Sequence, residues 1–149
     1  MDSESSTGLL NVTPEVLEGL KGKHPEAADI VDESILYRPI DYIPPGAFDL
    51  KDKEMVFDAA TKTKGLAGPS GMDDELYGRI LCSKNFKAEG QVLREEIAVI
   101  TRNLLKTAHH PSLVEGYTPC RLIPLDKNPG IRPIGVGEVL RRIVGKTIA

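Results

Sequence analysis

Tryptophan is absent from this 149-residue chain, and aromatic residues of all kinds make up only 5% of it. Its two cysteines, Cys82 and Cys120, are too few for the disulfide framework of a small secreted domain, so we expect both to be small core residues. No apolar run approaches the roughly 18–20 residues that a membrane span needs. No basic segment followed by an apolar one opens the chain, as it would in a secretory signal. We therefore expect an intracellular protein of the nucleus or cytoplasm, neither secreted nor embedded in a membrane.

Charge is divided unevenly along the chain, whose formal net charge is −3. Residues 1–60 hold 13 acidic and 5 basic side chains, whereas residues 61–149 hold 9 acidic and 14 basic ones. From residue 117 onward, the sequence contains six Lys or Arg and only two Asp or Glu. A basic stretch of this kind fits contact with phosphate or nucleic acid, although a solvated surface gives the same pattern.

Helical patterns occupy most of the chain. Thr13-Pro14-Glu15 has an N-cap residue, a proline at the first helical position and an acid in the first turn, and so predicts a helix start. Apolar residues recurring three and four positions apart predict further helices over 49–62, from Asp73, over 91–109 and over 136–146. In the longest of these, the apolar stripe comprises Leu93, Ile97, Ile100, Leu104 and Ala108.

A β-hairpin is predicted between the last two helices. Cys120–Leu125 has strand character, Asn128-Pro129-Gly130 contains the Pro-Gly order of a type II turn, and 131–134 forms the returning strand. Gly135–Gly137 then acts as a pivot into the last helix. We therefore expect an α+β fold that is mainly helical, with one hairpin near 120–134.

Several catalytic motifs are only partly present. Gly145-Lys146-Thr147 resembles the end of a P-loop, but Leu140 occupies the position of the required glycine. The adjacent carboxylates of Asp73 and Asp74 invite comparison with a polymerase metal site, yet a helical pattern follows them and favours a helix N-terminus. No third ligand accompanies His109-His110 at a supporting spacing. We predict neither a catalytic nor a metal-binding residue.

The hairpin carries two cations at its tip, Lys127 just before the turn and Arg132 just after it. Arginine offers a planar fork to phosphate oxygens, and lysine offers a compact point charge. Two such groups on one hairpin could hold a triphosphate, or they could be two solvated surface cations.

Two segments resemble a known family. The sequence RLIPLDKNPGIRPIGVGEVLRRIVGK, from Arg121 to Lys146, resembles the opening block of a reverse transcriptase domain of the retroelement type. Upstream, KGLAGPSGMDDELYGRIL, from Lys64 to Leu81, resembles the Lys-x-x-Gly-Pro-x-Gly block of the same enzymes, and the two occur in the expected order. The resemblance covers residues 64–149. It implies part of the fingers subdomain, preceded by a disordered leader (1–12) and an acidic helical and extended leader (13–63).

The resemblance assigns roles by position. Lys127 and Arg132 stand where the family contacts an incoming nucleoside triphosphate, and the partners implied are that triphosphate and an RNA or DNA template-primer. We expect further nucleic-acid contacts from the neighbouring cations Arg121, Arg141, Arg142 and Lys146. The family's Mg²⁺ is held by aspartates of a palm subdomain that residues 64–149 do not supply, so we expect no cofactor here and no activity of this piece alone. We also expect the palm to cover an exposed apolar face formed by Val136, Val139, Leu140, Ile143 and Val144.

Two other functions fit the same pattern. The chain could be a non-catalytic nucleic-acid-binding module that reuses the basic hairpin, or a helical interaction module, either one derived from a mobile element.

Overall fold

The computed structural model describes residues 8–24, 44, 46–106, 109, 111–127 and 129–149. Its elements are α1 (Pro14–Lys23), α2 (Lys53–Lys62), α3 (Asp74–Cys82), the 3-10 turn η2 (Lys84–Phe86), α4 (Lys87–Lys106), the 3-10 turn η3 (Pro111–Leu113), β1 (Cys120–Asp126), β2 (Ile131–Gly137) and α5 (Val139–Ile148). The predicted fold class is confirmed: the chain is α+β and mainly helical, with one antiparallel hairpin. None of the described helices is both long enough and apolar enough to cross a membrane.

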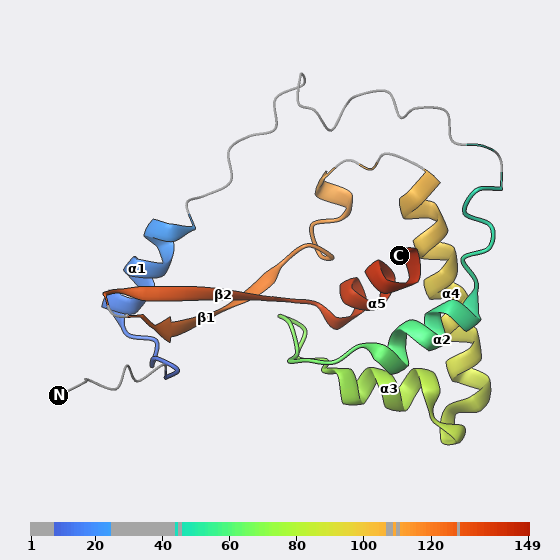
Figure 1. Cartoon of the computed structure of the whole chain (residues 1–149), viewed down its shortest axis with the longest axis horizontal. Coiled ribbons are helices and arrows are strands. Elements are labelled where there is room, and N and C mark those ends of the chain that lie inside the picture. Colours follow the sequence, from blue (N-terminus) through green and yellow to red (C-terminus); the bar gives the residue numbers. More distant parts are fainter. Residues whose placement is uncertain (1–7, 25–43, 45, 107–108, 110, 128) are drawn as a thin grey trace.

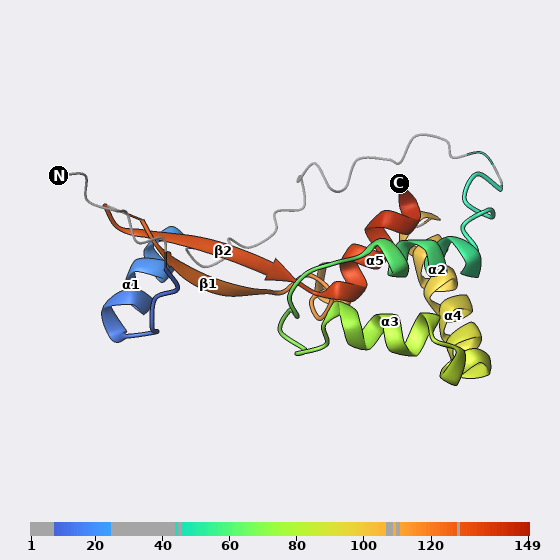
Figure 2. The same ribbon diagram turned by 60° about the horizontal axis from the view of Figure 1, so that its bottom comes forward.

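The molecule has two parts joined by the hairpin. Figure 1 shows α2, α3, α4 and α5 grouped at one end, with the β1–β2 ribbon extending away from them. Helix α1 lies against the far half of this ribbon in both views (Figures 1 and 2). The tip of the hairpin is therefore remote from the helical core, and α1 is the helix beside it.

Local signals set the helix starts. The Thr13 hydroxyl accepts a hydrogen bond from the Val16 amide at 3.3 Å and caps α1, as predicted. The Asp73 carboxylate caps α3 in the same way through the Leu76 amide at 2.8 Å, which confirms the helix-start interpretation of this residue. Helix α2 begins four residues later than predicted, because the Asp52 carboxylate binds the amides of Glu54 and Met55 and fixes the start at Lys53.

The core lies among the four grouped helices. Its buried side chains are Val56, Ala59, Ala60, Leu81, Ile97, Ala98, Val139, Ile143 and Val144. Helix α2 thus supplies three core residues, so the division expected at residue 63 does not separate two packing units. Helix α4 is described as far as Lys106, and His109, where the predicted helix ends, is not helical. The apolar stripe of α4 is only half covered: Ile97 is buried, whereas Leu93 and Ile100 are exposed. The last residue of that stripe, Ala108, lies outside the described residues.

The expected exposed face on the last helix is wrong. Val139, Ile143 and Val144 are at most 2% exposed, and Leu140 packs against the core from its edge. Val136 does not belong to the helix at all, because β2 continues through Gly135–Gly137, where we expected a pivot. The physical reason is that α2 and α4 pack against α5 and bury these side chains within the helical core.

The described start of the chain contacts the hairpin. Gly8, Leu9 and Leu10 lie beside β1, with a bridge between Leu9 and Leu125. The two cysteines differ: Cys82 is half-buried and packs against the core, whereas Cys120 is exposed, so the prediction of a core residue is wrong for Cys120. Residues 25–43, most of the extended leader, lie outside the described residues.

Candidate functional site

The strand register divides the hairpin into two faces. Arg121 pairs with Val136, Ile123 with Ile134, and Leu125 with Arg132. Directly opposed residues of an antiparallel pair project to the same side, and alternate pairs share a face. Arg121 and Arg132 therefore lie on one face, at opposite ends of an aliphatic strip. We call this the basic face: Arg121, Ile123, Leu125, Arg132, Ile134 and Val136.

The other face is covered by the N-terminal helix. It carries Ile131, whose side chain contacts α1 at Gly19, where a Cβ atom would lie 2.9 Å from the Ile131 Cδ1 atom. The buried Leu20 comes next on α1. Because α1 occupies this side, the basic face is the one left open.

The tip of the hairpin carries the two cations that the sequence singled out. Gly130 has φ +100°, the left-handed conformation that a type II turn requires at this position, and the Lys127 amide donates to the Gly130 carbonyl at 3.0 Å. This bond extends the ladder by one pair, so the strand alternation places Lys127 on the same side as Leu125 and Arg132. Lys127 and Arg132 are both exposed, and neither side chain makes a hydrogen bond or ion pair to another described residue.

Arg121 marks the base of the basic face. It lines a hollow of about 450 Å³ together with Gly65, Leu66, Ala67, Asp73, Asp74 and Glu75. The two aspartates in this hollow are already engaged, Asp73 as the cap of α3 and Asp74 in an ion pair with Lys64 at 3.9 Å. Arg121 therefore lies beside the loop that begins the upstream family-like block.

The remaining predicted nucleic-acid contacts point elsewhere. Arg141 donates to the Thr118 carbonyl at 3.2 Å, Arg142 to the Lys64 carbonyl at 3.0 Å, and Lys146 to the Lys62 carbonyl at 2.6 Å. Arg142 also binds the Leu66 carbonyl. Arg142 and Lys146 therefore satisfy carbonyls at and beyond the C-terminal end of α2, and Arg141 satisfies one in the segment before β1. The structure brings together Arg121, Lys127 and Arg132, and it gives the other three a role in holding the fold.

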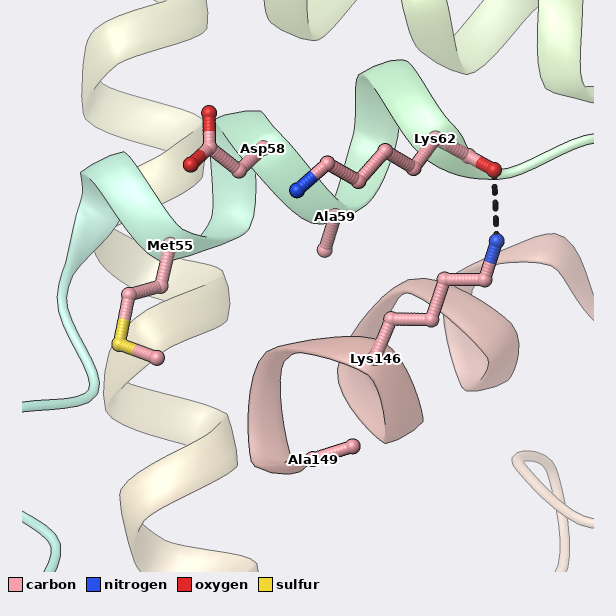
Figure 3. A pocket seen from close by; sticks show the side chains of 6 residues that line it. All are labelled: Met55, Asp58, Ala59, Lys62, Lys146 and Ala149. Atoms are coloured by element: carbon pink, nitrogen blue, oxygen red, sulfur yellow. Dashed lines mark hydrogen bonds between the residues drawn. The ribbon is translucent and has the colours of Figure 1, made fainter.

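One of these contacts borders a second hollow. Figure 3 shows a pocket of about 390 Å³ between α2 and α5, with the Lys146 ammonium reaching across to the Lys62 carbonyl. Met55, Asp58, Ala59 and Ala149 complete its lining (Figure 3). The pocket lies in the helical part of the molecule, away from the hairpin tip.

Two residues that the sequence did not single out connect the two family-like blocks. The Glu138 carboxylate is buried and accepts two hydrogen bonds from Ser70, from its amide and from its hydroxyl, both at 2.7 Å. Gly68 makes the approach possible, since a Cβ atom there would lie 2.8 Å from the main chain of Glu138. Burial, with a smaller contribution from the Glu138 charge, raises the pKa of the neighbouring Tyr77. The only advance signal was the Gly-Pro-Ser-Gly loop itself, which gives no partner.

No group of three or more His, Cys, Asp or Glu in the described part of the chain is arranged to hold a metal ion. His109 contacts the Asn103 carbonyl at 3.1 Å, whereas His110 lies outside the described residues.

Comparison of the chain with protein-family models, with curated proteins and with solved structures found no match. The geometry of the hairpin and the resemblance of its sequence are therefore the grounds for the function proposed below.

Proposed function

We propose that this chain contributes the nucleotide-contacting hairpin of an RNA-directed DNA polymerase of the retroelement type. Lys127 and Arg132 would contact phosphate oxygens of the incoming nucleoside triphosphate. The observation that carries the proposal is the pair of exposed tip cations on the open side of the hairpin, without partners among the described residues. Arginine and lysine in such a position can each form charge-assisted hydrogen bonds to phosphate.

The spacing of the two cations suits a chain of phosphates. Leu125 is paired with Arg132, and Lys127 lies two residues beyond Leu125 on the same side. Two residues of extended strand correspond to roughly 7 Å along the hairpin. Both side chains are long and mobile enough to converge on neighbouring phosphate groups from that separation.

The packing of the two family-like blocks supports the same proposal. The loop containing Ser70 and the junction containing Glu138 are held together by two short hydrogen bonds, and Arg142 reaches back to Lys64 and Leu66. If both blocks belong to one fingers subdomain, as the resemblance implies, they must contact each other. The contact between the two blocks is made by the Ser70 loop and Glu138, close to the base of the hairpin.

The proposal covers contact with nucleotide and template rather than catalysis. In the family, two Mg²⁺ ions are bound by palm aspartates, and the resemblance assigns no residue of this chain to that role. We therefore expect the chain alone to bind without extending a primer. Arg121, on the basic face, is the cation that we retain for template contact; Arg141, Arg142 and Lys146 already serve main-chain carbonyls.

Binding of a labelled deoxynucleoside triphosphate tests the proposal. We expect the double variant Lys127→Ala, Arg132→Ala to bind at least about tenfold more weakly than the wild type, since two charge-assisted contacts are lost. The matched control is Arg79→Ala, Lys84→Ala, which removes the same charge from two exposed positions in the helical part of the molecule. Equal affinity of wild type and double variant would refute the proposal.

A second arm separates the alternative functions. If the chain binds single-stranded RNA with a steep salt dependence but shows no triphosphate binding, a non-catalytic nucleic-acid-binding module is favoured. If it binds neither, the helical interaction module is favoured instead.

A further inference from the structure

The N-terminal segment is attached to the main chain on both sides of the hairpin tip. Residues 8–10 contact β1 immediately before Lys127, and α1 contacts β2 immediately before Arg132. We propose that residues 8–23 position the tip, with Lys23 as a positioning residue, and thereby set the affinity of the two cations for phosphate. This inference rests on the proposed function for its ligand, but the attachment itself can be measured without one.

The first attachment is a short stretch of added strand. Leu9 forms a bridge with Leu125, and the Leu10 amide donates to the Pro124 carbonyl at 3.0 Å. The Asp126 amide donates in turn to the Gly8 carbonyl at 3.0 Å. Asp126 adjoins Lys127, so this pairing holds the backbone of the residue next to the first cation.

The second attachment comes from α1. The Lys23 ammonium donates a short hydrogen bond to the Ile131 carbonyl, and Gly19 lies against the Ile131 side chain. Ile131 adjoins Arg132. The helix therefore holds both the backbone and the side chain of the residue next to the second cation, from the side opposite the basic face.

The hairpin has reason to need such support. An isolated two-stranded hairpin is at best marginally stable in water. Here the pair Pro124 and Pro133 contributes no amide donors, and Gly135 and Gly137 add little packing to β2. Residues 8–10 pair with β1 and helix α1 packs on one face of the hairpin, so both support the end of the hairpin that carries Lys127 and Arg132.

Substitution of Lys23 tests the proposal with a matched control on the same helix. Lys23→Met removes the donor, whereas Lys21→Met removes the same charge from an exposed side chain that pairs only with Glu18 on the solvent side. Amide hydrogen exchange is read at Asp126 and Lys127, with Ile97 of the core as reference. We expect exchange at the two tip amides to be about tenfold faster in Lys23→Met and unchanged in Lys21→Met, because a hydrogen bond to a charged group is lost.

The same variants are then tested with a deoxynucleoside triphosphate. We expect Lys23→Met to bind several-fold more weakly than the wild type at unchanged thermal stability of the core, and Lys23→Arg to restore binding. A purely structural lysine would leave the affinity unchanged.

A second pair of variants tests the helix contact without altering charge. Gly19→Leu places a side chain where Ile131 already lies, whereas Gly22→Leu extends into open space on the same helix. Both replace a helical glycine, so they share the gain in helix propensity. Faster tip exchange in Gly19→Leu alone supports the proposal.

The outcomes distinguish this inference from the proposed function. Unchanged tip exchange in both Lys23→Met and Gly19→Leu would overturn the positioning role, whatever the triphosphate data show. Faster exchange with unaltered triphosphate affinity would overturn it too. Absence of triphosphate binding by the wild type would overturn the proposed function, and accelerated exchange would then still support the attachment of the tip to residues 8–23.

Discussion

Replacing Gly68 by alanine should separate the upstream loop from the junction between β2 and α5. The added Cβ atom would lie 2.8 Å from both the Cα and the N atom of Glu138 and 2.9 Å from the carbonyl carbon of Gly137. These are main-chain atoms, which cannot rotate away as the end of a flexible side chain would. The loop must therefore move, and the two hydrogen bonds from Ser70 to Glu138 move with it.

The magnitude follows from three contributions. Forcing an extra methyl group into a packed site costs about 1–3 kcal/mol. Weakening hydrogen bonds to a buried carboxylate costs about 1.5–3 kcal/mol if one of them is lost outright. Alanine restricts the unfolded chain and returns about 0.4–1 kcal/mol, because Gly68 does not need a left-handed backbone. Together these contributions give an expected net loss of about 1.5–5.5 kcal/mol in the free energy of unfolding.

Urea unfolding measures this effect. With a slope of about 2 kcal/mol/M, the midpoint should fall by about 0.8–2.8 M. The control is Gly78→Ala in α3, where nothing lies within 4 Å of the new methyl group. We expect this control to gain up to about 1 kcal/mol from helix propensity. If Gly68→Ala unfolds at the wild-type midpoint, the close approach to Glu138 does not hold the two blocks together.

Three further predictions concern other parts of the chain. Arg142→Met should lower the free energy of unfolding by about 1–3 kcal/mol, because the Lys64 and Leu66 carbonyls lose their donor. The control Arg132→Met should leave the free energy of unfolding unchanged, and chemical denaturation measures both variants. Burial raises the pKa of the Cys82 thiol, so iodoacetamide at neutral pH should modify the exposed Cys120 faster, as followed by mass spectrometry. The hydrogen bond from Lys106, and to a lesser extent its charge, lowers the pKa of the Asp49 carboxyl. The contact between Lys106 and Asp49 therefore stabilises the fold above the ordinary pKa of aspartate, and this stabilisation is lost as the pH falls through the lowered value. Lys106→Met should return that pKa to its ordinary range in an NMR titration.

Local features of the fold were predictable because their causes lie within a few residues. Thr13-Pro14 begins α1, Asp73 caps α3, and Pro129-Gly130 closes the hairpin. Each depends on capping or turn chemistry that acts over two or three positions. The exposed tip cations follow from the same turn, since residues flanking a tight turn at the end of a ribbon project into solvent.

The errors concern contacts between distant segments. An amphipathic pattern shows that one face of α5 is apolar, but it does not show that α2, almost 80 residues earlier in the chain, covers Ile143 and Val144. The hydrogen-bond partners of the α5 cations could not be predicted for the same reason. Arg142 and Lys146 looked available because their carbonyl partners belong to the end of α2 and the loop that follows it.

The hydrogen bonds of α5 reduce the number of cations that are free to bind phosphate. A basic sequence supports phosphate binding only through the cations that the fold leaves without a partner. Of the six predicted here, three are used by α5 to bind carbonyls, and Arg121, Lys127 and Arg132 remain on one side of the hairpin. The charge of the C-terminal third thus serves two purposes: it attaches α5 to the end of α2, the loop after α2 and the segment before β1, and it equips the hairpin with free cations. Variants of the two groups should accordingly differ in kind: those in α5 lower stability, and those on the hairpin lower affinity for phosphate at constant stability.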